Sequence, residues 1–557
     1  MTDFAELART LDDISRVSGR NAKIDLVASF LRQVRPKDLV AATRFLGGAV
    51  FSERDPKVLN VSWRGVKQAL KQVVDFNDAE FSQLYEGDTG EAVAALLETE
   101  GRVRQAGLFS SSLTVSSVEK CFKDIAEAEG SGSRKKKESL LSQMLREAST
   151  REARYIVALV LNDMRIGLSK GLLAEGLAKA FEIGSDLVRR AWSLSGDLGQ
   201  VAHLAATEGR TALEILRPTV FSPVRPMLAT PADSVAELLQ DSEYEYSFEL
   251  KFDGARAQVH KDGRQIRIYS RRMQDVTGGL PDIVAIAERK VRAKEAILDC
   301  EVVAVDAEGR PFPFQTVMRR FGRTRNVETA EKEVTLRLYI FDVLLADGES
   351  LIDSPYSERR KTLHDVADSD LIAENVVTSD IAAASGFFER SRELGHEGLM
   401  AKRVDSPYVP GVRGKNWFKV KHTLDTMDLV VVAAEWGHGR RSKWLSDYHL
   451  AVRNEDTGGF ATIGKTFKGL TDAEFEEMTL RLQAIKTGEK GHIVTVRPEI
   501  VVEVLASEIQ SSPTYDSGMA LRFARILNTR YDKGPEDATT LDELRRIYEK
   551  QFKFKAR

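Results

Sequence analysis

The centre of the chain reads ELKFDGAR over residues 249–256. This stretch has the character of a strand that ends in a glycine turn. Because successive side chains of a strand point to opposite faces, Glu249, Lys251 and Asp253 are predicted to share one face. A lysine between two carboxylates is consistent with a surface ion-pair ladder and also with a reactive amine. The residues on either side of this stretch are needed to distinguish these interpretations.

The flanking sequence predicts an α+β domain built on antiparallel sheets, which we place at residues 214–423. Short runs rich in Val, Ile, Tyr and Phe are separated by turns such as the one at 261–264. The runs are 245–252, 255–260, 264–270, 296–306 and 336–345. Helical spacing is interspersed, for example over 282–294 and 380–394.

Residues 1–213 predict an all-α domain. Apolar residues recur there at three- and four-residue spacing, and glycine and proline are sparse. The break EGSGSRKKKE at 129–138 is either a solvated loop or a loop that contacts phosphates through its basic run. Four prolines between 217 and 231 then predict an extended linker to the central domain.

Residues 424–557 predict a small β-barrel of the OB type. The strand candidates are 428–436, 448–454, 460–467 and 499–510. One helix is predicted to begin near Thr471, because Thr471 and Glu474 fit a capping box. Several short strands with one inserted helix are typical of such a barrel.

Composition limits the classes of function. The chain has 557 residues, of which 42% are hydrophobic and 30% charged, as in a soluble multidomain protein. It has neither an apolar run of ~18 residues nor a signal peptide, so we expect a cytoplasmic protein. The two cysteines, Cys121 and Cys300, are too few for a four-cysteine zinc site. The net charge of −3 argues mildly against a nucleic-acid binder unless Lys and Arg gather on one face.

Further motifs follow the central stretch along the chain. They are Ser270-Arg271-Arg272, Leu298 to Val303 with Glu301, Tyr339 to Asp342 with Phe341, Glu397 to Lys402, and Tyr408 to Lys421 with Arg413, Lys419 and Lys421. Taken singly, each is consistent with an ordinary carboxylate, a core aromatic or a solvated strand face. In this order and at these spacings they resemble the motifs of the covalent nucleotidyltransferases, which comprise DNA ligases, RNA ligases and mRNA-capping guanylyltransferases.

The resemblance implies a role for each residue. Lys251 is expected to attack the α-phosphate of a nucleotide and to form a phosphoramidate. Phe341 is expected to stack on the base. Glu301 and Glu397 are expected to hold Mg²⁺, with the ribose as an alternative partner of Glu301. The other nucleotide contacts are expected from Glu249, Arg256, Arg271, Arg413, Lys419 and Lys421.

The attacking lysine has to lose its proton first. Neighbouring cations lower the pKa of a lysine because they disfavour its charged form. Four basic residues are therefore expected to lower the pKa of Lys251 while they neutralise the triphosphate. They are Arg271, Arg413, Lys419 and Lys421.

The C-terminal sequence favours one type among the covalent nucleotidyltransferases. Residues 521–533 resemble the last motif of ATP-dependent DNA ligases, whose basic residues reach the β- and γ-phosphates. Arg522, Arg525 and Lys533 are the corresponding residues here. The family usually has proline where Ala524 stands.

The N-terminal sequence identifies the expected acceptor. The turns at 165–167 and 195–199 resemble the DNA-binding domain of archaeal and eukaryotic replicative ligases. The resemblance implies a monomeric, ATP-dependent and Mg²⁺-dependent DNA ligase that seals nicked double-stranded DNA in replication, repair and recombination. The alternatives are an RNA ligase, a capping-type guanylyltransferase, or a non-catalytic, clamp-associated DNA-binding scaffold.

One weaker signal lies at 105–109. Gln105 to Phe109, QAGLF, resembles a shortened sliding-clamp-binding motif. The alternative is a plain loop in which the Leu-Phe pair is buried.

Overall fold

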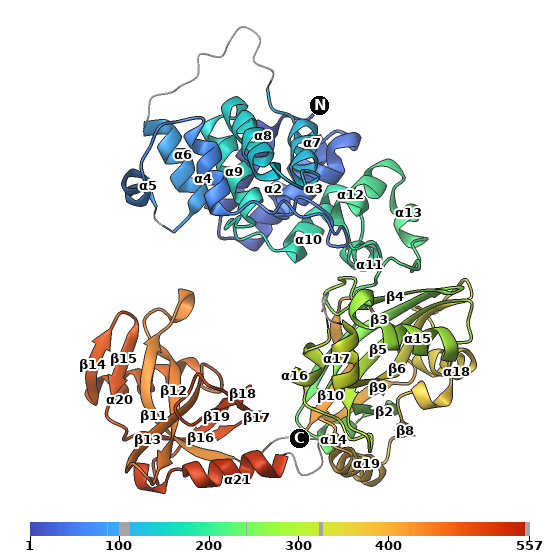
Figure 1. The fold of residues 1–557 in the computed structure, drawn as a ribbon, viewed down its shortest axis with the longest axis vertical. Coiled ribbons are helices and arrows are strands. Elements are labelled where there is room, and N and C mark those ends of the chain that lie inside the picture. The colour runs from blue at the N-terminus through green and yellow to red at the C-terminus, as the bar shows by residue number, and fades with distance from the viewer. Residues whose placement is uncertain are drawn as a thin grey trace.

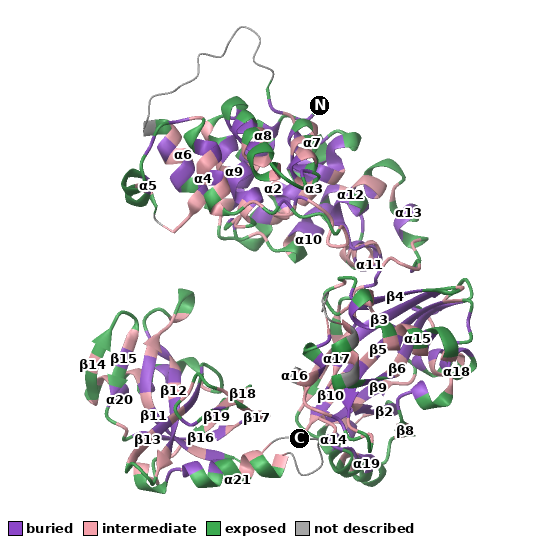
Figure 2. Cartoon of the chain, in the orientation of Figure 1, coloured by how far each residue is buried: buried purple, intermediate pink, exposed green. Residues whose placement is uncertain are grey.

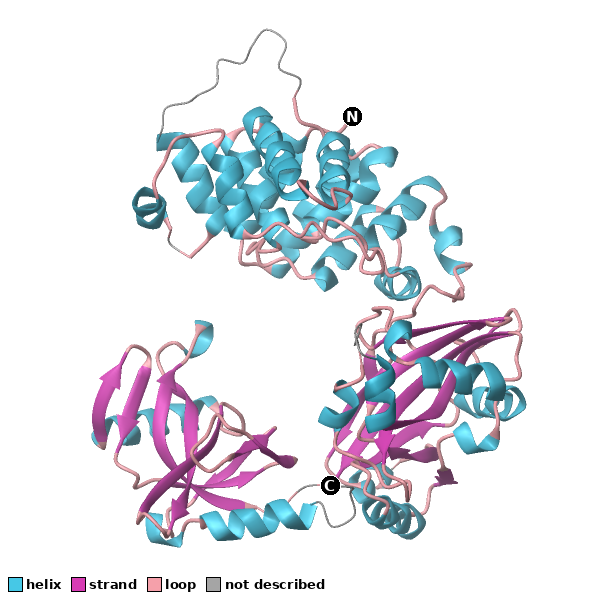
Figure 3. Cartoon of the chain, in the orientation of Figure 1, coloured by secondary structure: helices cyan, strands magenta, loops and turns pink. Residues whose placement is uncertain are grey.

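The computed structural model describes residues 1–85, 87–99, 112–240, 242–321, 327–422, 424 and 426–551. Figure 1 shows three parts arranged in the form of a C, with the N-terminal helical part at one end and the C-terminal β-rich part at the other. The central α+β part joins them and mixes helices with strands, whereas the N-terminal part is drawn with helices and loops alone (Figure 3). Each part has its own buried interior (Figure 2).

The N-terminal part is all-helical, which confirms the prediction for this region. Its helices are α1 (Phe4–Arg16), α2 (Arg20–Gln33), η1 (Pro36–Asp38), α3 (Leu39–Leu46), α4 (Trp63–Lys71), α5 (Asp78–Leu84), α6 (Thr89–Thr99), α7 (Val115–Ala126), α8 (Ser133–Glu147), α9 (Thr150–Leu161), α10 (Lys170–Ala180), α11 (Ser185–Ser195), α12 (Leu198–Thr207) and α13 (Arg210–Glu214). α1 buries Phe4, Leu7, Leu11 and Ile14, which lie on one face of the helix. α8 begins within the predicted break, so the basic run starts in its first turn.

The linker is shorter than the sequence predicts. Residues 217–227 are turns and extended chain, but Leu228–Ala232 form β1, so the prediction that the linker reaches 231 is wrong. β1 pairs in parallel with β10 (Arg413–Lys421) at the edge of a sheet. Pro231 is tolerated in β1 because an edge strand leaves one side without a hydrogen-bonding neighbour.

The central part holds two sheets with the strand orders β1-β10-β9-β2-β8 and β4-β3-β5-β6-β7. Its remaining elements are α14 (Val235–Leu239), β2 (Tyr246–Lys251), β3 (Ala255–Asp262), β4 (Gln265–Ser270), η2 (Thr277–Gly279), α15 (Pro281–Lys290), β5 (Glu295–Val305), α16 (Phe314–Met318), α17 (Val327–Glu333), β6 (Thr335–Ala346), β7 (Glu349–Ser350), α18 (Tyr356–Val366), η3 (Ser369–Leu371), β8 (Asn375–Thr378), α19 (Ile381–Glu393) and β9 (Gly398–Arg403). Apart from the parallel pair of β1 with β10, the described strands of these sheets pair antiparallel, as predicted.

The ELKFDGAR stretch lies where the two sheets meet. Its strand β2 belongs to the first sheet, and residues 252–254 lead directly into β3 of the second. Gly254 permits the close passage, because a Cβ there would lie 2.5 Å from the carbonyl oxygen of Val302 in β5. The turn therefore fixes the end of β2, and Lys251 with it, between the sheets.

The C-terminal part is a sheet with the order β13-β12-β11-β15-β14, in which β16 pairs with β11 and β19, beside the pair β17-β18. Its elements are β11 (Met427–Trp436), η4 (Gly439–Arg441), β12 (Leu445–Asn454), β13 (Gly459–Thr466), α20 (Asp472–Ala484), β14 (Lys486–Lys490), β15 (Ile493–Val496), β16 (Val501–Leu505), β17 (Glu508–Ser511), β18 (Met519–Arg522), β19 (Arg525–Thr529), η5 (Pro535–Asp537) and α21 (Leu541–Gln551). The capping box of Thr471 and Glu474 is confirmed. The prediction of one strand over 499–510 is wrong, because β16 and β17 pair with different partners.

Two predictions from composition concern the described residues as a whole. No helix among them is long and apolar enough to cross a membrane. Both cysteines of the described chain are free thiols: Cys300 is buried in β5, and Cys121 is half-buried in α7.

Candidate active site

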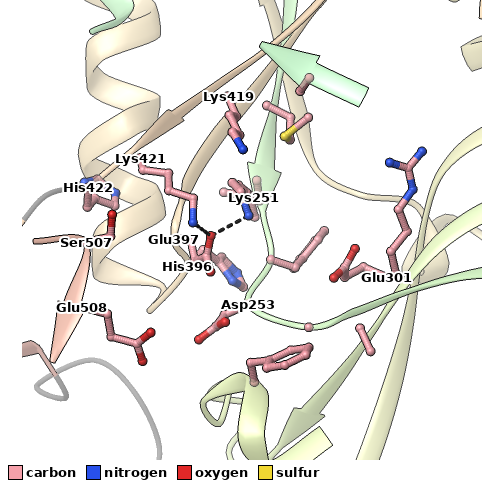
Figure 4. Close-up of a pocket in the computed structure, with 18 of the residues that line it drawn as sticks. Lys251, Asp253, Glu301, His396, Glu397, Lys419, Lys421, His422, Ser507 and Glu508 are labelled. Atoms are coloured by element: carbon pink, nitrogen blue, oxygen red, sulfur yellow. Dashed lines mark ion pairs between the residues drawn. The ribbon is translucent and has the colours of Figure 1, made fainter. Parts of the chain in front are cut away.

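A cavity of about 1190 Å³ opens between the two central sheets and the C-terminal part. Figure 4 shows its centre, where Lys251, Glu397 and Lys421 point toward one another. The structure brings most of the predicted site residues to the walls of this cavity. They are Glu249, Lys251, Arg256, Arg271, Glu301, Phe341, Glu397, Arg413, Lys419, Lys421 and Arg522.

The register of three strands places the two central lysines. Gly398 at the start of β9 lies opposite Lys251 of β2 on one side and opposite Lys421 of β10 on the other. Glu397 precedes Gly398, and one of its carboxylate oxygens, Oε2, lies 2.5 Å from Lys251 Nζ and 2.7 Å from Lys421 Nζ. The backbone N–H of Glu397 also donates to the carbonyl oxygen of Lys251 at 2.9 Å. One carboxylate thus holds both amines at the floor of the cavity.

The charge state of Lys251 differs from the expectation. Burial lowers the pKa of Lys251, but the carboxylates of Glu397, Glu301 and Asp253 outweigh it, so the pKa is raised. The expectation that neighbouring cations lower this pKa is therefore wrong for the nucleotide-free protein. The cations act instead on Lys419, whose pKa is lowered by burial and then by Lys421, Lys251, Arg413 and Arg271.

The ion pair that raises the pKa of Lys251 also lowers the pKa of Glu397. Burial opposes ionisation of its carboxyl, but Lys251 and Lys421 prevail and hold the pKa of Glu397 well below its ordinary value. The centre of the cavity is therefore an ionised carboxylate between two ammonium groups.

Glu249 lines the cavity but is not the ion-pair partner of Lys251. Its Oε2 lies 2.8 Å from the buried Lys402 Nζ, and its Oε1 accepts a hydrogen bond from the Tyr356 hydroxyl. Arg360 lies 3.6 Å away on the same carboxylate. Lys251 and Glu249 thus do not form the ion-pair ladder that the spacing left open. The motif 397–402 contains Lys402, but its spacing gave no sign that this lysine faces Glu249.

Aromatic side chains form the wall next to Glu249. The rings of Phe341 and Trp417 meet edge to face, with centroids 6.2 Å apart. Lys402 Nζ lies 4.7 Å from the centroid of Phe341 and donates to its carbonyl oxygen at 2.7 Å. The Arg256 guanidinium lies 5.4 Å from the same ring. Phe341 is therefore held by Trp417, Lys402 and Arg256 and contributes an aromatic ring to the lining of the cavity.

Arg256 is held by a buried carboxylate. Asp299 accepts from Arg256 Nε at 3.0 Å and from Nη2 at 2.6 Å. Burial opposes the charge of Arg256, but Asp299 prevails and raises its pKa. The guanidinium that the sequence assigns to the nucleotide is thus fixed in orientation within the protein.

Two carboxylates are available for a metal ion. Glu301 of β5 lies opposite Arg256 of β3 in register, and burial raises the pKa of its carboxyl to about 8 despite Lys251 and Arg256. The described residues hold no cluster of three or more metal-ligating side chains. Glu301 and Glu397 are the two cavity residues that could hold Mg²⁺, which takes few carboxylates and completes its shell with water and phosphate oxygens.

Two predicted residues of the last motif lie elsewhere. Among the described residues that line the cavity, Arg525 and Lys533 are absent. Lys533 Nζ instead lies 2.5 Å from Asp428, and Arg525 is exposed on β19. The cavity includes Phe523, which the sequence reasoning missed; its side chain is 59% exposed and its φ is +54°. An aromatic residue between the basic residues of 521–525 was the available signal.

The N-terminal motifs form tight turns. Arg165 has a φ of +43°, and the buried Lys23 donates from Nζ to the carbonyl oxygens of Ile166 and Gly167 at 2.9 and 3.0 Å. In the second turn, Asp197 pairs with Arg44. The candidate clamp motif, Gln105 to Phe109, lies outside the described residues.

Comparison with known proteins covers all three parts of the chain. The family model "DNA ligase N terminus" matches residues 3–178. The model "ATP dependent DNA ligase domain" matches residues 226–421, which include the cavity's central walls. The model "ATP dependent DNA ligase C terminal region" matches residues 441–533. The three matches together define an enzyme of the ligase class that consists of three parts.

Individual proteins agree over the whole length. DNA ligase 1 of Korarchaeum cryptofilum is 42% identical over 549 residues, which cover 98% of each chain. The DNA ligase of Thermococcus fumicolans is 40% identical over 559 residues, which cover 100% of each chain. The solved structure "Pmar-Lig_PreS3" has the same fold, with a TM-score of 0.54, 16% identity and coverage of 94% of this chain and 99% of that chain. The chain belongs to the family of ATP-dependent DNA ligases.

Proposed function

We propose that Lys251 is the nucleophile of a three-step reaction that seals nicks in duplex DNA. Its Nζ attacks the α-phosphorus of ATP, forms a phosphoramidate and displaces pyrophosphate. The AMP group then passes to the 5′-phosphate at the nick, which frees Lys251. Finally the 3′-hydroxyl attacks the activated 5′-phosphate, forms the phosphodiester bond and displaces AMP. The observation that carries this proposal is the Lys251 ammonium, which lies at the floor of a cationic cavity and is held by Glu397.

The cavity suits ATP in each of its parts. Phe341 offers the stacking surface for the base, and Glu249 and Arg256 lie on the same wall. The phosphates would bind the basic residues around Lys251, which would also place the α-phosphate for attack. These residues are Arg271, Arg413, Lys419, Lys421 and, from the C-terminal part, Arg522.

Mg²⁺ is proposed as the metal of this site, with Glu301 and Glu397 as its protein ligands. When bound, it would polarise phosphate oxygens and share the carboxylates that raise the pKa of Lys251 in the free protein. Lys251 would then be surrounded mainly by cations, which is the condition under which its amine becomes neutral.

The three parts are proposed to act as domains with the limits 1–213, 214–423 and 424–557. The helical domain would grip duplex DNA through sequence-independent backbone contacts. Arg525 and Lys533 are not among the described residues that line the cavity, and Lys533 pairs with Asp428, so their proposed contact with the β- and γ-phosphates requires the C-terminal domain to turn. We propose a monomer, with Gln105 to Phe109 as its candidate clamp contact.

The test is covalent labelling of the protein with α-labelled ATP and Mg²⁺. Wild type should become labelled and Lys251→Ala should not. Lys290→Ala is the matched control, because Lys290 at the end of α15 pairs with Asp370 of η3 and is not among the described residues that line the cavity. Labelling that persists in Lys251→Ala would sink the proposal. Labelling by GTP in place of ATP would favour a guanylyltransferase, and sealing of nicked RNA but not nicked DNA would favour an RNA ligase.

A further inference from the structure

Tyr408 lies behind the wall of the cavity, in the loop between β9 and β10. Its side chain is 2% exposed and belongs to a hydrophobic cluster that also contains Met227, Trp417 and Leu194 of α11. Its ring meets that of Trp417 edge to face, with centroids 5.5 Å apart. Tyr408 thus contacts the aromatic wall but does not itself line the cavity among the described residues.

The Tyr408 hydroxyl has a complete set of hydrogen-bond partners. It donates to Asp299 Oδ2 at 2.7 Å and accepts from the backbone N–H of Met227 at 2.9 Å. Arg256 Nη2 lies 3.3 Å away and donates to the same oxygen. One donor and two acceptor positions are all that a phenol offers. Burial and then Asp299 raise the pKa of Tyr408 well above its ordinary value, so it stays a donor.

Arg256 is held from three sides by this arrangement. Its Nε and Nη2 bind Asp299, Nη2 also reaches Tyr408, and Nη1 donates to the carbonyl oxygen of Met227 at 2.7 Å. The orientation of the guanidinium in the cavity wall therefore depends on Asp299, on the Tyr408 hydroxyl and on the backbone of Met227.

The backbone of Met227 belongs to the linker between the helical and central parts. Met227 is the residue before β1, and both of its backbone polar groups bind this cluster. Arg225, two residues earlier, donates its backbone N–H to Ser193 of α11 at 3.1 Å. The linker thus joins the helical part to Arg256 through two contacts. Arg225 binds Ser193 of α11, and Met227 binds Arg256.

We propose that Tyr408 is a positioning residue, whose hydroxyl fixes Arg256 in the nucleotide cavity and ties it to the linker at Met227. The proposal rests on the proposed function of the cavity as the ATP site. Tyr408 acts through Arg256 and touches no reacting atom.

The test is Tyr408→Phe, which keeps the ring and removes the hydroxyl. In self-adenylylation, the KM for ATP, taken as the ATP concentration at half-maximal rate, should rise about tenfold, because a hydrogen bond that orients a charged group is lost. The maximal single-turnover rate should stay within about twofold. Tyr448→Phe is the matched control: Tyr448 is equally buried, in β12, and its hydroxyl has no hydrogen-bond partner among the described residues. An unchanged KM in Tyr408→Phe, or an equal rise in Tyr448→Phe, would overturn the proposal.

A double-mutant cycle separates positioning from general loss of structure. If Tyr408 acts through Arg256, the KM of Tyr408→Phe/Arg256→Gln should equal that of Arg256→Gln alone. Multiplicative effects would contradict the proposal. A wild-type measurement is independent of how the variants fold: ATP without Mg²⁺ should slow hydrogen–deuterium exchange in the peptide that contains Met227, and unchanged exchange would also contradict it. If wild type labels with ATP but these outcomes fail, the proposed function stands and only the role of Tyr408 falls.

Discussion

Lys251 shows how one residue can be held in the wrong charge state for its proposed reaction. An ammonium between Glu397, Glu301 and Asp253 is a poor nucleophile, because the carboxylates stabilise its proton. The same ammonium is well placed to attract a triphosphate into the cavity. The free protein is thus arranged to bind its substrate, and the proposed attack requires that the bound substrate change the charges around the lysine.

His260 in β3 supplies a prediction about pH at the residue scale. Its Nδ1 accepts from the backbone N–H of Phe221 in the linker at 2.9 Å, and its Nε2 lies 2.8 Å from Gln258 Oε1. Burial and then Arg54 lower the pKa of His260 to about 3 from an ordinary 6.5. The folded protein therefore favours the neutral ring, so this stabilisation is complete above pH 6.5 and is lost as the pH falls toward 3.

We expect His260→Gln, which does not titrate, to be less stable than wild type at pH 7 and to approach it as the pH falls. The difference should shrink by at most about 1.4 kcal/mol per pH unit below 6.5. Thermal unfolding of both proteins at pH 7 and at pH 4.5 measures it. Other titrating groups cancel in the comparison, so a gap in Tm that does not change with pH would count against this account.

At the scale of elements, local sequence was enough to place most strands and helices but not their partners. Alternation and turn residues located β2 to β6, and the capping box located α20. The pairing of Lys251 with Glu397 depends on the register of β2 with β9, which joins residues 146 positions apart and has no local signal. The split of 499–510 and the strand character of β1 likewise depend on which strands lie beside them.

The sequence located the charged residues of the site but did not predict which residues they bind. Motif resemblance located Glu249 and Lys251, but their alternation on a strand suggested that they could pair with each other. In the structure Lys402 of β9 and Tyr356 of α18 bind Glu249. Such partners come from tertiary packing, which the spacing of a single strand does not record.

Gly398 offers a prediction at the element scale. Its φ is +140°, and a Cβ there would lie 2.1 Å from the carbonyl oxygen of Val420 in β10. Gly398→Ala should therefore separate β9 from β10, cost about 2 kcal/mol of stability, and displace Glu397 from the two lysines. We expect a lower Tm and self-adenylylation reduced at least about tenfold.

Gly386→Ala is the control for this change. Gly386 lies inside α19, and no described heavy atom lies within 4 Å of its Cβ position. Alanine in a helix is favoured over glycine by ~1 kcal/mol, so the control should be at least as stable as wild type. If Gly398→Ala behaved like Gly386→Ala, the close contact of β9 with β10 would not determine the geometry of the site.

At the scale of the whole molecule, the linker is held on both sides. On the central side, the backbone N–H of Val224 donates to Gln258 at 2.7 Å, and Phe221 binds His260. On the helical side, Arg54 Nη2 donates to the carbonyl oxygen of Leu194 at 2.6 Å, and the guanidinium also binds Ser222 and Pro223. The linker is therefore fixed by hydrogen bonds to both the helical and the central part. We call this set of contacts the junction.

This junction yields the last prediction. Arg54→Ala would leave buried carbonyl groups of Leu194 and Pro223 without a donor, each at a cost of ~1–3 kcal/mol. The linker should then open more often and be cut faster by a protease at 217–227. Arg210→Ala removes an exposed pair with Glu214 and should leave the cleavage rate unchanged. Because Arg54 lies outside the cavity, self-adenylylation at saturating ATP should stay within about twofold of wild type, whereas nick sealing, which needs the helical part and the active site on one DNA, should fall several-fold. Equal losses in both reactions, or an unchanged cleavage rate, would show that the junction does not set the arrangement of the two parts.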